Sequence, residues 1–470
     1  MHLTHTQFKG RLVFIGFGSI GQGVLPLILR HIGGLTTDRI TIVTADDAGR
    51  PEADHYGIRF IINPLKLDNY RNILDPMVGP GDFVLNLSVD VSSLDLMKLC
   101  YERGALYLDT CTEPWPGGYT DEKVPHALRT NYALREECLE FRRNHPIGPT
   151  AVMTHGANPG LVSHFVKKAL IDIAKDTGLV KPEPTTREEW ADLAKELGVK
   201  VIHIAERDSQ VSNIPKKIGE FVNTWSVDGF VSEGCQPAEL GWGSHEKHFP
   251  ADGKQFDFGP KNAIYLMRPG CTTRVRSWTP YCRAYQGYLI THAEAVSISD
   301  YLTVQTSDLE VYRPTVHYAY HPSDSTIVSL HELCGQNYRM QPEKRIMMGD
   351  IVSGIDELGV LLAGHAKNAY WYGSQLSVEE ARELAPYNSA TSLQVTSAVL
   401  AGMVWAMENP NKGFVEPDDM DYKRNLEICM PYLGPVVGKY TDWTPLADRE
   451  HLFAEDLDKS DAWQFKNVRV

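Results

Sequence analysis

Short apolar runs alternate with helical stretches over the first third of the chain. Residues 11–16 (RLVFIG) form an apolar run that enters a glycine turn, which predicts a buried parallel strand. Residues 20–32 then show apolar side chains at helical spacing, and Gly33-Gly34 ends this predicted helix. The further elements that we predict are strands at residues 39–44, 59–63, 82–88, 105–110 and 149–154, and helices at residues 67–78 and 92–102. This alternation is typical of a doubly wound parallel sheet.

The pattern changes after residue 160. A long helix is predicted over residues 161–175, and irregular stretches then separate the strand-like segments. Those segments are residues 200–205, 263–267, 315–320 and 369–372. We predict a second, α+β domain with a mixed or antiparallel sheet. Residues 389–407 form an apolar helix that ends at Asn409-Pro410, and we expect it to pack back on the first domain.

A glycine-rich loop follows the first predicted strand and opens the first helix. Its sequence is Gly16-Phe17-Gly18-Ser19-Ile20-Gly21. In a βαβ unit, the first glycine allows the tight turn, the second lets the backbone approach a pyrophosphate, and the third allows close packing of helix and strand. The helix N-terminus then faces the phosphates. The sequence therefore predicts an α/β protein whose Rossmann-type unit binds NAD through these residues.

We place this dinucleotide-binding domain at residues 1–155, completed by roughly residues 388–470. The α+β domain, for substrate binding and dimerisation, is expected at residues 156–387. The second strand ends in Thr44-Ala45-Asp46-Asp47. An acid here accepts hydrogen bonds from the adenine ribose of NAD and repels the additional phosphate of NADP. We predict that Asp46 has this role, with Asp47 as the alternative, and Arg50 leaves NADP open.

Polar side chains also follow the next two strands, at the edge of the sheet where cofactors bind. They are Asn86-Leu87-Ser88 with Asp90, and Asp109-Thr110 with Glu113. We predict that Asn86, Leu87, Ser88, Asp109 and Thr110 contact the cofactor and that Asp90 and Glu113 face a substrate. Helix capping is the alternative role for Ser88 and Asp90. Asn158 precedes Pro159 in the loop HGANPG and either caps a helix or lies beside the nicotinamide. We favour the second role and predict that Asn158 and Pro159 both contact the cofactor.

Overall composition narrows the partners. Among 470 residues, 60 are acidic and 46 basic, so the net charge is −14, which argues against nucleic acid and anionic membranes as partners. The polar N-terminus has no signal-peptide pattern, and no apolar run reaches the roughly 18 residues of a membrane span. Eight cysteines without CxxC pairs favour a reducing compartment over disulfides or zinc, so we expect a cytoplasmic protein without a metal site.

Acidic and aromatic residues recur in the second domain. Glu206 follows a strand, Trp225, Asp228, Glu233 and Glu239 come next, and His292 and Glu294 lie further on. Aromatic faces attract an ammonium group and carboxylates pair with it, so this composition favours a cationic ligand. Each residue alone is more often a surface acid or a core tryptophan, and sequence spacing does not show that they converge.

Taken together, these segments closely resemble the bacterial homospermidine synthases, which are relatives of saccharopine dehydrogenase. The resemblance extends over most of the chain. It is carried by residues 16–21, 86–90 (NLSVD), 107–115 (YLDTCTEPW), 154–160 (THGANPG), 204–208 (IAERD), 223–235 (NTWSVDGFVSEGC), 292–295 (HAEA) and 391–413.

The resemblance implies an activity. The family makes sym-homospermidine from two putrescines with release of ammonia, or uses spermidine as the aminobutyl donor with release of 1,3-diaminopropane. NAD oxidises the amine, the imine exchanges its amine, and the same cofactor reduces the new imine. The resemblance further implies a homodimer in which Trp225 makes a cation–π contact and Glu206 and Glu233 hold and deprotonate ammonium groups. Asn158, His292, Asp90 and Glu113 would line the channel, and we add Glu294 from the HAEA motif.

Two alternatives stay open. A saccharopine dehydrogenase-like enzyme would act on amino acids, whose carboxylates need Arg or Lys in the pocket. The motifs of the second domain are mainly acidic, but Arg207 and Arg313 keep this alternative open. The other alternative is an NAD-binding protein without catalysis, which loss of the acidic and aromatic residues would indicate.

Overall fold

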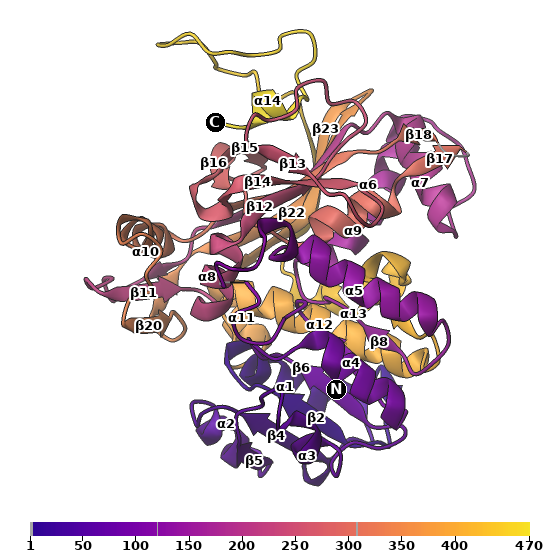
Figure 1. The fold of residues 1–470 in the computed structure, drawn as a ribbon, viewed down its shortest axis with the longest axis vertical. Helices are drawn as coiled ribbons and strands as arrows, with labels where there is room; N and C mark the ends of the chain where they lie inside the picture. Colours follow the sequence, from indigo (N-terminus) through magenta and orange to yellow (C-terminus); the bar gives the residue numbers. More distant parts are fainter. Residues whose placement is uncertain (1–2, 120, 307–308) are drawn as a thin grey trace.

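A parallel sheet forms the lower half of the molecule in Figure 1, within a computed structural model that describes residues 3–119, 121–306 and 309–470. The strand order is β24-β8-β7-β6-β2-β4-β5, and every pairing is parallel. The strands are β2 (Leu12–Ile15), β4 (Ile40–Thr44), β5 (Arg59–Ile62), β6 (Phe83–Asn86), β7 (Leu106–Asp109), β8 (Ala151–Val152) and β24 (Phe414–Val415). The doubly wound sheet predicted from the sequence is therefore present, with β24 as an additional edge strand.

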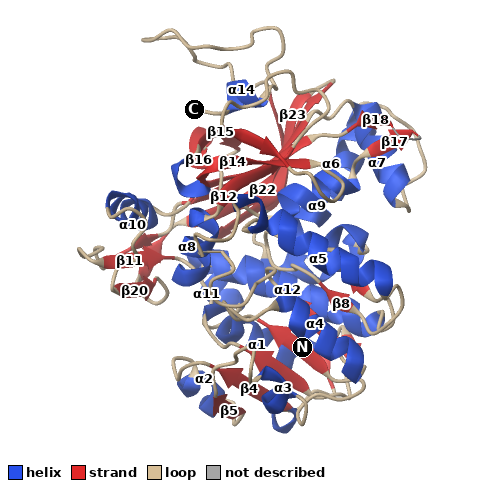
Figure 2. Ribbon diagram, viewed as in Figure 1, coloured by secondary structure: helices blue, strands red, loops and turns tan. Residues whose placement is uncertain are grey.

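Helices connect and cover these strands (Figure 2). They are α1 (Ser19–His31), α2 (Arg50–His55), α3 (Tyr70–Leu74), α4 (Ser93–Arg103) and α5 (Asn131–Asn144). The helix predicted over residues 67–78 is shorter in the structure, since Pro76 cannot donate a backbone hydrogen bond. Neither Ser88 nor Asp90 caps α4: Ser92 does, with its side chain accepting from the Asp95 amide at 3.2 Å.

The second sheet is mixed, as predicted. Its order is β13-β14-β12-β19-β9-β22-β23-β25, with β16 beside β19 and β15 beside β16. Strands β19 and β9 are parallel, and the other pairings are antiparallel. The bounds are β9 (Val201–Asp208), β12 (Pro237–Gly241), β13 (Gly253–Gln255), β14 (Ala263–Pro269), β15 (Arg274–Thr279), β16 (Arg283–Tyr288), β19 (Thr315–His321), β22 (Ile355–His365), β23 (Asn368–Ser377) and β25 (Val436–Thr441).

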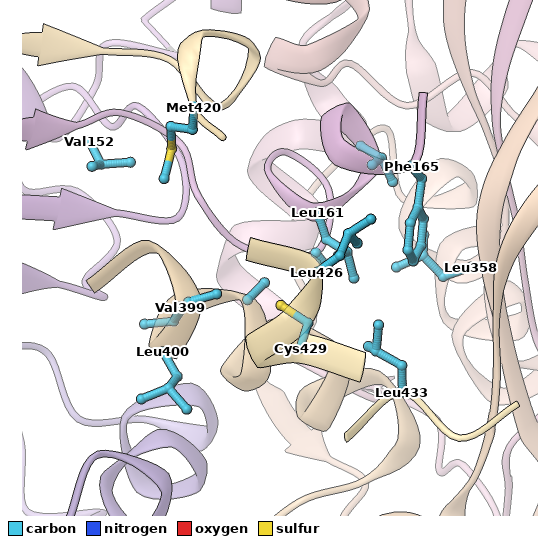
Figure 3. Close-up of a cluster of buried hydrophobic side chains, with 14 of the residues drawn as sticks. Val152, Leu161, Phe165, Leu358, Val399, Leu400, Met420, Leu426, Cys429 and Leu433 are labelled. Carbon is cyan, nitrogen blue, oxygen red and sulfur yellow. The ribbon is translucent and has the colours of Figure 1, made fainter. Parts of the chain in front are cut away.

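Helices α12 (Ala390–Glu408) and α13 (Tyr422–Cys429) lie between the two sheets, and α6 (Leu161–Asp176) packs on β22, β23 and α13. Figure 3 shows the apolar core around them, in which Val152 comes from the parallel sheet and Leu358 from the mixed sheet. Helix α12 packs against α1 and α13, as we expected from its apolar sequence. It is long and apolar enough to cross a membrane, but 89% of its most apolar window is buried inside the protein.

A smaller layer flanks the mixed sheet at the left of Figure 1. It pairs β11 (Glu220–Asn223) with β20 (Glu343–Ile346) and carries α8 (Val227–Cys235) and α10 (Asp324–Gly335). The remaining named helices and strands are β1 (Thr6–Gln7), β3 (Ile32–Gly33), β10 (Val211–Ser212), β17 (Val304–Thr306), β18 (Leu309–Tyr312), β21 (Ile351–Ser353), α7 (Arg187–Leu197), α9 (Ala293–Tyr301), α11 (Val378–Leu384) and α14 (Phe465–Val468).

The C-terminal tail departs from our expectation that residues 388–470 all join the first domain. Strand β25 pairs with β23 of the mixed sheet, and the yellow tail of Figure 1 lies at the upper end of that sheet, away from the parallel sheet. Arg276 of β15 donates to the Pro445 carbonyl at 2.7 Å, and Arg469 pairs with Asp252 at 2.6 Å. Residues 436–470 are therefore placed with the second sheet. The sequence VVGKYT of β25 lacks the apolar run by which we recognised the other strands.

Candidate active site

The glycine loop has the shape that a dinucleotide requires. Gly16 has a φ of +79°, and a Cβ there would lie 2.9 Å from the Leu87 carbonyl oxygen. A Cβ on Gly21 would lie 2.8 Å from the ring of Phe17, so its close contact is within the loop itself. Gly18 is the N-cap of α1, without a side-chain cap, and a Cβ on it would meet nothing within 4 Å. Open space thus faces the first turn, with Ser19 and Ile20, and this fits a pyrophosphate.

The side chains that we predicted to contact the cofactor differ in exposure and in the hydrogen bonds that they already make within the protein. Asp46 is exposed, and its Oδ1 accepts from the Ala48 amide at 3.0 Å, so part of its carboxylate caps its own turn. Thr44 is buried at the end of β4. Asn86 is also buried: its amide donates to the Tyr107 hydroxyl at 3.1 Å, and its Oδ1 accepts from the Ser88 hydroxyl at 2.6 Å. Asn86 therefore positions Ser88, which with Leu87 is partly exposed.

Asp109 connects strands within the protein. One oxygen accepts from the Thr154 amide at 2.6 Å, and the other accepts from the Tyr107 hydroxyl at 2.9 Å. Burial raises the pKa of this carboxyl to about 6. We assigned Asp109 to the cofactor, but its hydrogen bonds hold the β7 and β8 ends together. Its neighbour Thr110 is partly exposed and lies beside Gly156.

The loop with Asn158 reaches from the parallel sheet to the mixed sheet. The Asn158–Pro159 peptide bond is cis, and α6 begins after Gly160, which is its N-cap. Asn158 is therefore not a helix cap. Its side-chain amide donates to Glu206 Oε2 at 2.9 Å. This hydrogen bond joins the cofactor side of the molecule to the acidic residues of the second domain.

Glu206 lies on β9 and is almost completely buried. The Tyr318 hydroxyl of the neighbouring strand β19 donates to its Oε2 at 2.5 Å. Burial raises the pKa of Glu206 to about 7, against the opposing effect of these hydrogen bonds. A carboxyl with this pKa is poised between acid and base at neutral pH.

His292 is held between two carboxylates. Its Nε2 lies 3.0 Å from Glu233 Oε2, and its Nδ1 lies 3.2 Å from Glu294 Oε1. Burial alone would lower the pKa of His292, but the two carboxylates outweigh it and raise the pKa well above its usual value. The imidazole is therefore a cation, and its ring centroid lies 4.4 Å from that of Tyr318. Glu294 Oε2 is buried and has no hydrogen-bond partner among the described residues.

Glu113 and Asp90 approach the same cluster from the parallel sheet. Glu113 is buried, accepts from the Asp90 amide at 3.3 Å, and receives the Cys111 thiol at 3.3 Å. Burial raises the pKa of Glu113 to about 8, and repulsion from Glu233 and Asp90 adds to this. Asp90 itself is exposed and has a φ of +63°. Glu113, which follows a strand of the parallel sheet, is thus close enough to Glu233 of α8 to be repelled by it.

Trp225 completes an aromatic wall beside these acids. It lies between β11 and α8, is half-buried, and its Nε1 donates to the Tyr320 hydroxyl at 3.4 Å. Tyr320 stacks on Tyr318 at 5.1 Å, and Tyr318 faces His292. The aromatic wall therefore consists of Trp225, Tyr320 and Tyr318, and it ends at the imidazolium of His292.

Two acids of the sequence motifs have other partners, although Asp228 lies close enough to Asp90 to raise the pKa of that carboxyl. Asp228 is exposed and pairs with Lys344, while Glu239 is buried and accepts from the backbone amides of Asn131 and Tyr132 at the start of α5. No group of three His, Cys, Asp or Glu side chains in the described part of the chain is arranged to hold a metal ion.

Other residues of the site were not predicted from the sequence. Tyr318 and Tyr320 alternate along β19, so they share one face, but the pairing of β19 with β9 that brings them to Glu206 left no local signal. Asp208 and Asp356 were also missed. Both are fully buried and face each other across β9 and β22.

Fold and site together define a dinucleotide-binding protein of the saccharopine dehydrogenase type. The family model "saccharopine dehydrogenase NADP binding domain" matches residues 12–152, and "saccharopine dehydrogenase C-terminal domain" matches residues 156–441. Homospermidine synthases from Blastochloris viridis and Mesorhizobium japonicum are 57% and 55% identical to this chain. The alignments cover 99% of the chain in each case, and 98% and 97% of the relatives.

A solved structure gives the same assignment. The homospermidine synthase of Legionella pneumophila, solved in complex with NAD, is 47% identical to this chain, with a TM-score of 0.93. The match covers 99% of this chain and 98% of that structure. The chain belongs to the homospermidine synthase family, as the sequence motifs predicted.

Proposed function

We propose that this protein transfers an aminobutyl group from putrescine or spermidine to putrescine. The product is sym-homospermidine, and ammonia or 1,3-diaminopropane is released. The observation that carries the proposal is the hydrogen bond of 2.9 Å between Asn158 and Glu206. It places a buried carboxyl with a pKa near neutrality beside the loop that follows the cofactor strands.

The cofactor that fits the first domain is NAD. The open space at Gly18 would hold the pyrophosphate, and Thr44, Asp46 and Ser88 lie at the strand ends that a dinucleotide crosses. When bound, NAD supplies an acceptor for the hydride of the amine carbon and returns it to the new imine.

Glu206 is the group best suited to remove the proton from the donor amine. An ammonium group cannot be oxidised to an imine while its lone pair carries a proton, so a base is required. Both hydrogen bonds of Glu206 end on Oε2, and Oε1 is the oxygen that could receive the substrate proton. The nearby His292 imidazolium favours the ionised form of this carboxyl.

The other acids suit the remaining ammonium groups of the substrates. Glu233 and Glu113 repel each other electrostatically, and a cation between them would relieve that repulsion. Asp90 lies further out, at the exposed rim. The ring of Trp225 offers its face to an ammonium group, as a desolvated cation–π contact. We further propose that the apolar and aromatic surroundings keep water from hydrolysing the imine.

Arg207 and Arg313 are the two arginines that could have bound the carboxylate of an amino-acid substrate, and both have other partners. Arg207 donates to the backbone carbonyl of Asp208 and lies 3.6 Å from Asp324. Arg313 donates to the Thr303 hydroxyl and the Trp242 carbonyl, near the start of β19. No Lys or Arg in the described part of the chain pairs with Glu113, Glu206, Glu233 or Glu294. These contacts favour a substrate that carries ammonium groups alone.

A product analysis tests the proposal. Purified protein is incubated with putrescine, with and without added NAD, and the amines are identified by mass spectrometry. We expect homospermidine and one ammonia for each molecule formed, without net formation of NADH. NAD-linked oxidation of an amino acid without turnover of putrescine or spermidine would contradict the proposal. Absence of both reactions would favour the non-catalytic alternative. The homodimer is a separate proposal, which mass photometry of the same sample checks.

A further inference from the structure

Three cysteines meet behind α8, on elements that are far apart in the sequence. Cys235 is the last residue of α8, Cys271 lies in the short 3₁₀ turn η3 (Gly270–Thr272), and Cys334 is in the last turn of α10. The Sγ atoms of Cys271 and Cys334 are 4.0 Å apart, and Cys235 also interacts with the Cys271 thiol. All three are free thiols in the structure. The proposed reaction does not use any of them.

The three thiols differ in access and in acidity. Cys271 is buried, while Cys334 and Cys235 are partly exposed. Hydrogen bonding from Cys271 lowers the pKa of Cys334 to about 7, and the nearby Arg274 guanidinium contributes to this. The Cys334 thiolate is therefore the nucleophile of the group, and the Cys271 thiol is positioned to react with it next.

We propose that Cys271 and Cys334 form a reversible regulatory disulfide when the protein meets a peroxide. The Cys334 thiolate attacks one peroxide oxygen, which breaks the O–O bond, gives a sulfenic acid and releases hydroxide. The Cys271 sulfur then attacks the Cys334 sulfur, and the sulfenic hydroxyl leaves as water with the Cys271 proton. The two sulfurs lose two electrons, and one hydrogen peroxide is reduced to two waters. A dithiol reverses the reaction by thiol–disulfide exchange.

The disulfide would be felt at the active site through α8. A Cβ on Gly234 would lie 3.4 Å from Cys271 Cβ, and Gly234 directly follows Glu233, the partner of His292. On its other side, a Cβ on Gly270 would lie 2.5 Å from the Leu289 carbonyl oxygen, three residues before His292. A disulfide needs its sulfurs about 2.05 Å apart, so the 4.0 Å gap between Cys271 and Cys334 has to close. A shift of Cys271 during that closure would change its contact with Gly234, and through it the position of Glu233.

The test uses the full-length protein in its reduced form. It is treated with hydrogen peroxide, catalase stops the reaction, and free thiols are blocked with iodoacetamide under denaturing conditions before digestion and mass spectrometry. We expect a peptide pair linked through Cys271 and Cys334, and about 2 Da lost from the intact chain. Dithiothreitol should abolish the link. A link between Cys235 and Cys271, or no link at all, would overturn the proposal.

Variants connect the modification to the site. The linked pair should disappear in Cys334→Ser and persist in Cys282→Ser, a matched control with a partly exposed thiol elsewhere on the mixed sheet. Homospermidine formation by the unmodified sequence should fall about five-fold on oxidation and recover with dithiothreitol, whereas Cys334→Ser should keep its rate. An unchanged rate with the link fully formed would overturn the regulatory role.

Only this second measurement rests on the proposed function. The mass measurement decides the disulfide without any turnover. The rate at which iodoacetamide modifies Cys334 in the folded protein should rise with pH around a midpoint near 7. A midpoint near the pKa of an ordinary thiol would show that Cys334 is not the nucleophile of the group. If the reduced protein makes no homospermidine, the proposed function fails, while the linked peptide still decides the chemistry of the thiol pair.

Discussion

The glycine loop and the acidic cluster are built in opposite ways. The loop consists of six consecutive residues between β2 and α1, and the chain at Leu87 lies against its first glycine. The cluster draws its side chains from β9, β19, α8, the start of α9 and the loops after β6, β7 and β8. Local sequence is therefore enough to identify the loop, whereas tertiary structure alone assembles the cluster.

The two regions also differ in electrostatics. At the loop, a helix N-terminus faces open space and favours an anion. In the cluster, Glu113, Glu206 and Glu294 are buried, and among the described side chains His292 is the cation paired with the group. Burial of unpaired carboxylates costs free energy, which shows in the raised pKa values of Glu113 and Glu206. A cationic substrate would offset that cost. The cluster is therefore electrostatically complementary to a diamine, whereas the loop is complementary to a phosphate.

The largest effect on activity is expected from Glu206→Gln, which tests whether the acidic cluster supplies the base. The amide keeps the shape and the contacts with Asn158 and Tyr318 but cannot take up a proton. We expect kcat to fall by about 10²- to 10⁴-fold, the usual contribution of a general base. In the unmodified enzyme, kcat/KM should decline below about pH 7, because protonation of Glu206 removes the base. The variant should lose that decline.

Glu246→Gln is the matched control for Glu206→Gln. Burial raises the pKa of Glu246 to about 7 as well, but its carboxylate accepts from the Thr315 hydroxyl and the Phe465 amide on the far side of the mixed sheet. Steady-state kinetics across pH should show near-normal turnover for this variant. Near-normal turnover in Glu206→Gln instead would remove Glu206 from the chemistry.

Trp225→Ala tests the aromatic wall. A desolvated cation–π contact contributes about 2 kcal/mol or more, and with the lost packing against Phe230 we expect kcat/KM to fall about 100-fold. Trp225→Phe keeps a ring with a weaker quadrupole and should lose less, mostly in KM. Kinetics with putrescine measure both variants. Equal activity of the Ala variant and the unmodified enzyme would show that the substrate does not reach this ring.

A smaller effect is expected for Tyr318→Phe. The lost hydrogen bond stabilises the Glu206 carboxylate, so its removal raises the pKa of Glu206 further. Activity at pH 7 should fall about 10-fold, and the acidic decline of kcat/KM should move to higher pH, with recovery in alkaline buffer. Tyr285→Phe removes a buried hydroxyl that donates to the Ala319 carbonyl at 2.7 Å and should leave the pH profile in place. An unshifted profile in Tyr318→Phe would make its role purely structural.

These differences explain what the sequence could reveal. Apolar runs predicted every strand of the parallel sheet except β24, because buried parallel strands are continuously hydrophobic. Of the long hairpin β22–β23, residues 369–372 alone were predicted, and β25 was missed, since their registers depend on neighbours distant in the chain. Tyr318 could not be linked to Glu206 without the pairing of β19 with β9. Glu206, Glu233 and His292 were singled out among the acidic and aromatic segments of the second domain, and the family resemblance suggested their roles. Only the structure brings them together.

The smallest effect we predict, from Gly18→Ala, separates ligand binding from folding. A methyl group at Gly18 meets no protein atom within 4 Å, so the Tm should not change. If the pyrophosphate occupies that space, the same methyl group crowds it, and the Kd for NAD should rise about five-fold, the equivalent of about 1 kcal/mol of overpacking. Gly349→Ala, which also adds a methyl group in open space, should change neither quantity. Calorimetric titration with NAD and thermal unfolding measure both variants. An unchanged Kd in Gly18→Ala would mean that the phosphates lie away from the helix N-terminus. The glycine loop would then be an ordinary turn between strand and helix, without a role in binding the pyrophosphate.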